Sequence, residues 1–252
     1  MSGVRGSTQK RQPPEGDERV SDLGWSVALN DANPDPRVAC VVLADVSGSM
    51  EGEPIEALER GFAAFTNYLH NESLACKRVE VAVVTFGTVA SVLVPMQEAR
   101  TIAPVQFTAR GTTNLAAGIH LSLDILEDRK HAYKVAGLQY YRPWILVLTD
   151  GKPNLDGFDD AVARLNAAEA ARGVTVFPVG AGPRVDYQQL ARLSRQRSPA
   201  PLDGLKYEAL FEWLSASLSN VSNSSEFARD DQALNTMGDR VPLPSVSGWT
   251  SA

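Results

Sequence analysis

Oxygen-bearing side chains follow two apolar stretches of this 252-residue sequence. The first stretch, 38–44, leads directly into Asp45-Val46-Ser47-Gly48-Ser49, which places one carboxylate and two hydroxyls at alternate positions. The second stretch, 144–149, is followed directly by Asp150. Carboxylate and hydroxyl oxygens, with no histidine or cysteine among them, suit a hard divalent cation such as Mg²⁺ or Mn²⁺. The pattern therefore indicates a metal-binding site.

The elements around these residues indicate how they could meet. Strand-like apolar stretches alternate with helix-like patterns, which predicts an α/β domain with a doubly wound, mostly parallel six-stranded sheet and helices on both faces. We expect 91–94 to return antiparallel to 79–86 as an edge strand. In such sheets ligands bind beyond the carboxyl ends of strands where the strand order reverses. Asp45 and Asp150 both stand at such ends, so we expect them to be neighbours.

The individual elements follow from the apolar spacing. The first helix is expected to start near Pro54, and the later helices to cover 115–126, 158–172, 186–195 and 206–220. The strands are expected to cover 38–44, 79–86, 91–94, 144–149 and 174–180. The polar stretch 127–142 either extends the helix before it or forms a surface excursion. Gly173 is expected to adopt the left-handed conformation that ends a helix, and Pro178 to lie at a strand end or a sheet edge.

The domain boundaries follow from composition. We expect a disordered tail at 1–23, a lead-in segment at 24–36, one domain at 37–221 and a second disordered tail at 222–252. The net charge of −6, without a dense basic block in the apolar region, argues against nucleic acid as a partner. Two cysteines, Cys40 and Cys76, indicate free thiols in a reducing compartment. With no apolar stretch of the ~20 residues that cross a bilayer, we expect a cytoplasmic protein without membrane insertion.

These motifs resemble the metal-ion-dependent adhesion site of von Willebrand factor type A (VWA) domains. The matching residues are Asp45-x-Ser47-x-Ser49, a threonine in Gly-Thr-Thr-Asn at 111–114, and Thr149-Asp150-Gly151. Thr113 matches the family's threonine better than Thr112, because it stands five residues before Gly118, as in the family.

The resemblance implies a function as well as a fold. The hydroxyls of Ser47, Ser49 and Thr113 would bind Mg²⁺ or Mn²⁺, while Asp45 and Asp150 would bind it directly or through water. An Asp or Glu carboxylate of a partner protein would complete the coordination. Within the family, the sequence looks most like the bacterial TerY-type proteins of tellurium resistance and stress response. That likeness implies kinase-like or phosphatase-like partners.

Two other functions compete with a metal-dependent interaction module. A phosphohydrolase that uses an aspartyl nucleophile and Mg²⁺ would need a second acid two residues after Asp45, where this chain has Ser47. We therefore expect a protein that is not an enzyme. A metal-independent scaffold is the second alternative, in which the metal site is empty or vestigial and partners bind through the helices or tails. Taken alone, Asp45, Ser47 and Ser49 could also cap the turn before the helix at Pro54.

Overall fold

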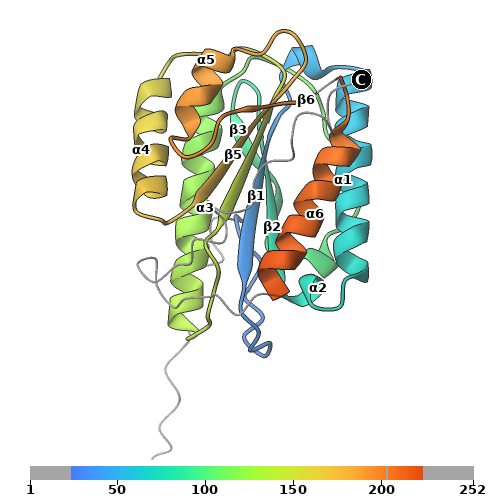
Figure 1. The fold of residues 1–252 in the computed structure, drawn as a ribbon, viewed down its shortest axis with the longest axis vertical. Coiled ribbons are helices and arrows are strands. Elements are labelled where there is room, and N and C mark those ends of the chain that lie inside the picture. The colour runs from blue at the N-terminus through green and yellow to red at the C-terminus, as the bar shows by residue number, and fades with distance from the viewer. Residues whose placement is uncertain (1–23, 203, 224–252) are drawn as a thin grey trace, which may run out of the picture.

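The computed structural model describes residues 24–202 and 204–223, and it has a six-stranded sheet at its centre (Figure 1). The strand order is β3-β2-β1-β4-β5-β6, and only β3 runs antiparallel to its neighbour. The strands are β1 (Val38–Asp45), β2 (Val79–Phe86), β3 (Ala90–Glu98), β4 (Trp144–Thr149), β5 (Thr175–Ala181) and β6 (Ala200–Leu202). This confirms the predicted doubly wound sheet with an antiparallel edge strand.

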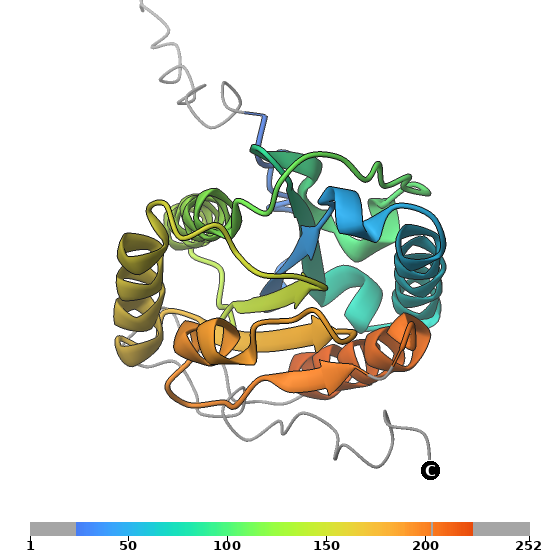
Figure 2. The same ribbon diagram turned by 90° about the horizontal axis from the view of Figure 1, so that it is seen from above.

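Helices cover both faces of the sheet (Figure 2). They are α1 (Glu53–Asn71), α2 (Ala75–Arg78), α3 (Leu115–Val135), α4 (Phe158–Ala170), α5 (Tyr187–Leu190) and α6 (Tyr207–Asn223), with short 3-10 turns at Gly48–Met50, Ala99–Thr101 and Ala191–Leu193. α1 and α6 lie side by side on one face, while α3 and α4 lie on the other. Two separate apolar cores result, one on each face.

The central strand β1 is buried along its whole length. Because successive side chains of a strand point to opposite faces, Cys40 and Val42 enter the core beneath α1 and α6, whereas Val41 and Leu43 enter the core beneath α3 and α4. A parallel strand that is covered on both sides is apolar at every position. This explains why its sequence shows a continuous apolar run and no alternation.

α1 starts where the sequence predicted. Pro54 stands in its first turn, where the missing N–H of proline costs no hydrogen bond. An apolar stripe that runs from Ile55 to Leu69 is buried against the sheet and α6. Gly61 lies where the two helices meet, and a methyl group added there would stand 2.8 Å from the Phe211 ring. The close packing of α1 on α6 therefore depends on the small size of this residue.

Several element boundaries differ from the expectations. α3 continues to Val135. Of the two alternatives for the stretch 127–142, most of it therefore extends the helix. The left-handed residue after α4 is Arg172, with φ 59°, and not Gly173 as expected. α5 is only four residues long and continues as a 3-10 turn, because its predicted range 186–195 contains few buried side chains.

Pro178 lies inside β5 and not at its end. It pairs with Val147 of β4, but β6 begins to pair only at the next residue, Val179. At Pro178, β5 is therefore not yet paired with β6 on that side. The missing backbone N–H of proline is tolerated at such an unpaired position.

The tails expected at 1–23 and 222–252 lie outside the described residues, except that Ser222 and Asn223 complete α6. In the part of the chain that the structure describes, every helix is too short or too polar to cross a lipid bilayer.

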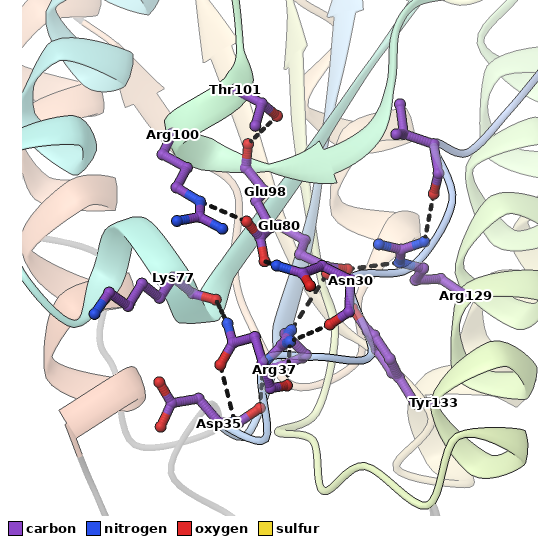
Figure 3. Close-up of polar contacts among 12 residues, drawn as sticks. Asn30, Asp35, Arg37, Lys77, Glu80, Glu98, Arg100, Thr101, Arg129 and Tyr133 are labelled. Carbon is purple, nitrogen blue, oxygen red and sulfur yellow. Dashed lines mark hydrogen bonds and ion pairs between the residues drawn. The ribbon is translucent and has the colours of Figure 1, made fainter.

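A buried polar network lies at the amino end of the parallel strands (Figure 3). Glu80 Oε2 accepts hydrogen bonds from Arg129 Nε at 2.6 Å and from the hydroxyl of Tyr133, while Arg37 Nε lies 3.4 Å from Glu80 Oε1. Arg37 and Arg129 also donate to backbone carbonyls of the lead-in segment 24–36, including that of Val27. The network therefore fastens this segment to the domain.

Candidate metal centre

The five predicted ligands lie on three loops at the carboxyl ends of the strands. Asp45 is the last residue of β1, Ser47 and Ser49 follow it, and Asp150 directly follows β4. β1 and β4 are neighbours at the point where the strand order reverses. Thr113 directly precedes Asn114, the residue whose side chain caps the amino end of α3. The predicted proximity of Asp45 and Asp150 is therefore confirmed by the topology.

A chain of hydrogen bonds joins four of these residues. The Ser47 amide donates to Asp45 Oδ1 at 2.8 Å, and Ser47 Oγ lies 3.0 Å from Ser49 Oγ. Ser49 Oγ donates to Asp150 Oδ1 at 2.6 Å, across 101 positions of the sequence. The oxygens of the β1 and β4 loops thus converge in one small region.

Thr113 reaches the same region from the third loop. A methyl group added to Gly151 would stand 3.9 Å from Ser49 Oγ and 4.0 Å from Thr113 Oγ1, so both hydroxyls face this glycine. The Thr113 carbonyl also accepts a hydrogen bond from the Asn154 amide at 2.9 Å, which ties its loop to the loop after β4. All five predicted residues are therefore brought together.

Backbone contacts hold the first and third loops against each other. The Gly48 amide donates to the Gly111 carbonyl at 3.0 Å, and the Arg110 amide donates to the Val46 carbonyl at 2.6 Å. Gly111 has φ +80°, and a methyl group there would lie 2.2 Å from Thr88 Oγ1. Only glycine fits this position without displacing a neighbour.

The two carboxylates of the centre are buried. Asp45 is 1% exposed and Asp150 is 6% exposed. Burial raises the pKa of Asp45 above its ordinary value, hydrogen bonds from Ser47 and Thr149 lower it, and the negative charge of Asp150 raises it further. A cation between the two groups would offset both the burial and the mutual repulsion.

Two residues that contact the carboxylates of the centre were not among the predicted ligands. Thr149 Oγ1 donates to Asp45 Oδ2 at 2.6 Å, which fixes the second carboxylate oxygen. Its position directly before Asp150, at the end of β4, is the sequence feature that could have identified it. Arg184, in the loop between β5 and α5, forms an ion pair with Asp150 Oδ2 at 2.8 Å. No motif in the sequence marks this arginine.

The donor set fits a hard divalent cation. It offers two carboxylates and three hydroxyls, and the described residues contain no group of three or more His, Cys, Asp or Glu side chains arranged for a metal. A cation held here would therefore depend on the neutral hydroxyls as much as on the acids. Oxygen-only coordination suits Mg²⁺ or Mn²⁺ better than metals that prefer nitrogen or sulfur ligands.

Comparison with known proteins places this fold and motif in one family. A family model described as von Willebrand factor type A domain matches residues 40–203, a range that includes all five predicted ligands. A comparison with curated proteins finds no match.

Solved structures show the same fold. A von Willebrand factor type A protein from Catenulispora acidiphila aligns with a TM-score of 0.56 and 16% identity, over 73% of this chain and 43% of that chain. The pilus adhesin SpaC from Lactobacillus rhamnosus GG aligns with a TM-score of 0.59 and 16% identity, over 75% and 30% of the two chains. Proximal thread matrix protein 1 from the mussel byssus aligns with a TM-score of 0.52 and 17% identity, over 74% of this chain and 49% of that chain. The chain spans less than half the length of each, and identities this low establish a common fold only.

Proposed function

This chain belongs to the von Willebrand factor type A family, and on that premise we propose that it is a divalent-metal-dependent protein-interaction module. In this proposal Ser47, Ser49 and Thr113 bind Mg²⁺ or Mn²⁺ through their hydroxyls. Asp45 and Asp150 bind the ion directly or through water and orient the serines. The bound ion supplies an electrophilic coordination position that an Asp or Glu carboxylate of a partner protein fills.

The convergence of Ser47, Ser49 and Asp150 in one hydrogen-bond chain is the observation that supports this proposal most. Residues that merely capped the turn before α1 would have no reason to meet an acid from the β4 loop. The Ser47 side chain makes no cap hydrogen bond to the turn that follows it. The geometry therefore favours an ion site over a set of local caps.

The more specific part of the proposal concerns the cellular setting. On the strength of the sequence resemblance, we propose a cytoplasmic, bacterial, TerY-type role in a stress-response or tellurium-resistance system. Kinase-like or phosphatase-like proteins are the partners that this resemblance implies. We do not propose catalysis, because Ser47 occupies the position where an aspartyl phosphohydrolase needs its second acid.

Calorimetric titration with MgCl₂ and MnCl₂ tests the metal centre. We expect the wild-type chain to bind one ion, and the double variant Ser47→Ala/Ser49→Ala to bind at least about tenfold more weakly, since loss even of an outer partner of a metal site costs that much. Ser73→Ala is the matched control, because Ser73 is an exposed serine on the α1–α2 connection. Absence of ion uptake by the wild-type chain would overturn the proposal.

A second measurement separates the competing functions. Partner capture in MgCl₂ that is lost in EDTA and in Asp45→Asn supports the interaction module, whereas capture that is indifferent to the metal supports the scaffold. Metal-dependent hydrolysis of a phosphoester that Asp45→Asn abolishes would instead identify a phosphohydrolase.

A further inference from the structure

Arg184 reaches the candidate metal centre from the solvent side. Its Nη2 donates to Asp150 Oδ2 at 2.8 Å and to the Ser49 carbonyl at 3.1 Å. The other oxygen of Asp150 accepts the hydrogen bond from Ser49 Oγ. One guanidinium nitrogen therefore bridges the two loops that contribute most of the proposed metal ligands.

The position of Arg184 makes it an alternative to a metal ion. Asp45 and Asp150 are two buried carboxylates at the same edge of the sheet, and buried charges need a compensating partner. Arg184 is such a partner for Asp150. A divalent cation bound by Asp150 would bring a larger charge to the same carboxylate and would repel the guanidinium. The two cations would therefore compete for Asp150.

The surroundings of Arg184 allow it to move away. Its side chain is 63% exposed, whereas that of Asp150 is 7% exposed. A cavity of about 180 Å³ opens beside the pair, lined by Pro54, Leu205 and Tyr207 among others. Since an arginine this exposed is readily hydrated, its release disturbs no packed core.

We propose that Arg184 is an internal counterion of the metal-free centre and leaves Asp150 when a divalent ion binds. This inference rests on the proposed function, because it requires that the ion bind at Asp150 and the three hydroxyls. Arg184 would then set the metal concentration at which the centre fills. Metal loading would also leave a guanidinium at the rim, close to where a partner's carboxylate binds.

Calorimetric titration with MgCl₂ gives the first test. We expect Arg184→Gln to bind Mg²⁺ about two- to five-fold more tightly than the wild-type chain, because Mg²⁺ no longer has to displace the exposed guanidinium, a change of the size measured for surface ion pairs. Lys152→Gln is the matched control, because Lys152 carries the same charge on the loop after Asp150, but the described contacts of Asp150 involve Arg184 and not Lys152. We expect the control to stay within about 1.5-fold of wild type, since salt screens its charge.

Nuclear magnetic resonance of the arginine side chains gives the second test. The Nε–H signal of Arg184, identified by its loss in Arg184→Gln, should move when MgCl₂ saturates the wild-type chain. The signal of Arg192, which pairs with Asp159 of α4, serves as an internal reference and should not move.

The outcomes separate this inference from the proposed function. If the wild-type chain takes up no Mg²⁺, the metal centre itself is wrong. If it takes up Mg²⁺ while Arg184→Gln and Lys152→Gln change the affinity equally, or while the Arg184 signal stays fixed, the centre stands and the counterion role of Arg184 is overturned.

Discussion

Asp45 is a buried carboxylate whose ionisation costs stability when no cation is bound. A carboxyl group with a higher pKa in the folded than in the unfolded chain holds its proton more tightly when folded. The free energy of unfolding therefore falls as the pH rises above the ordinary Asp value of 3.8, and the lost stability stays lost at pH 7. Without a neighbouring cation, the ionised Asp45 side chain would therefore lower the free energy of unfolding.

We expect Asp45→Asn to raise the urea midpoint of unfolding at pH 7 in EDTA, because the neutral amide avoids the cost of a buried charge. In saturating MgCl₂ the wild-type midpoint should rise, whereas that of Asp45→Asn should not. A lower midpoint for Asp45→Asn in EDTA would contradict this reasoning. It would mean that the hydrogen bonds from Ser47 and Thr149 outweigh the burial of the charge.

At the scale of residues, the sequence was informative where ligands follow a strand directly. Asp45, Ser47 and Ser49 are one short stretch of chain, so their grouping could be predicted without knowing any tertiary contact. Arg184 could not be predicted, because it contacts Asp150 across 34 positions and Ser49 across 135 positions of the sequence. Side chains in loops carry no periodic signal that reports such a contact.

At the scale of elements, α1 and α6 depend on a close approach at Gly61. A methyl group there would stand 2.9 Å from the Tyr207 carbonyl carbon, which belongs to the backbone and cannot move aside. We expect Gly61→Ala to lower the free energy of unfolding by about 1–3 kcal/mol, as overpacked cores do. This loss should outweigh the ~1 kcal/mol of helix propensity that alanine gains over glycine.

Urea unfolding monitored by circular dichroism checks this prediction. Ala64→Leu enlarges an exposed position on the same helix and should stay within about 0.5 kcal/mol of wild type. If Gly61→Ala matched or exceeded the wild-type stability, the contact between the two helices would have to be looser than described.

The lead-in segment 24–36 depends on the network around Glu80. Arg129 both pairs with Glu80 and donates to the Val27 carbonyl at 2.8 Å. Tyr133 donates to the same carboxylate, and its ring centroid lies 5.6 Å from the Arg129 guanidinium carbon. We expect Arg129→Met to destabilise the domain by about 3–5 kcal/mol, because it leaves a buried charge poorly compensated. Tyr133→Phe removes one hydrogen bond to a charged group and should cost about 1.5–3 kcal/mol.

Hydrogen exchange distinguishes the two variants further. The Val27 amide donates to the Met96 carbonyl at 3.0 Å, so its protection reports attachment of the segment to β3. Arg129→Met should speed exchange at Val27 beyond what the loss of global stability explains, while Tyr133→Phe should not. Equal effects at Val27 would show that Arg129 does not fasten the segment directly.

The elements that the sequence predicted well are those with long apolar patterns. Strands β1, β2 and β4 are buried on both faces, so their composition alone defines them. β6 has three residues and no distinguishing pattern, and it was not placed individually. The extension of α3 was left open because Arg129 and Tyr133 look like surface residues, although both are buried around Glu80.

At the scale of the whole molecule, the two ends of the sheet have different polar chemistry. At the amino ends of the strands, Glu80 is matched by cations of the chain itself. At the carboxyl ends, Asp45 and Asp150 have only the exposed Arg184 as a described ion-pair partner between them. The buried acid at one end is therefore paired with cations of the chain, and the other end gains most from an added cation.

This asymmetry predicts that Mg²⁺ stabilises the whole folded chain. The proposed ligands come from three loops that are far apart in sequence, so the unfolded chain cannot present them together. Stabilisation should then follow the logarithm of the Mg²⁺ concentration, at about 1.4 kcal/mol per tenfold increase above the dissociation constant. Thermal unfolding across a series of MgCl₂ concentrations measures this slope. Ser73→Ala should keep the MgCl₂ concentration at which stabilisation begins, whereas in Ser47→Ala/Ser49→Ala this onset should move at least about tenfold higher. Equal onsets for both variants would assign the effect to ions bound elsewhere.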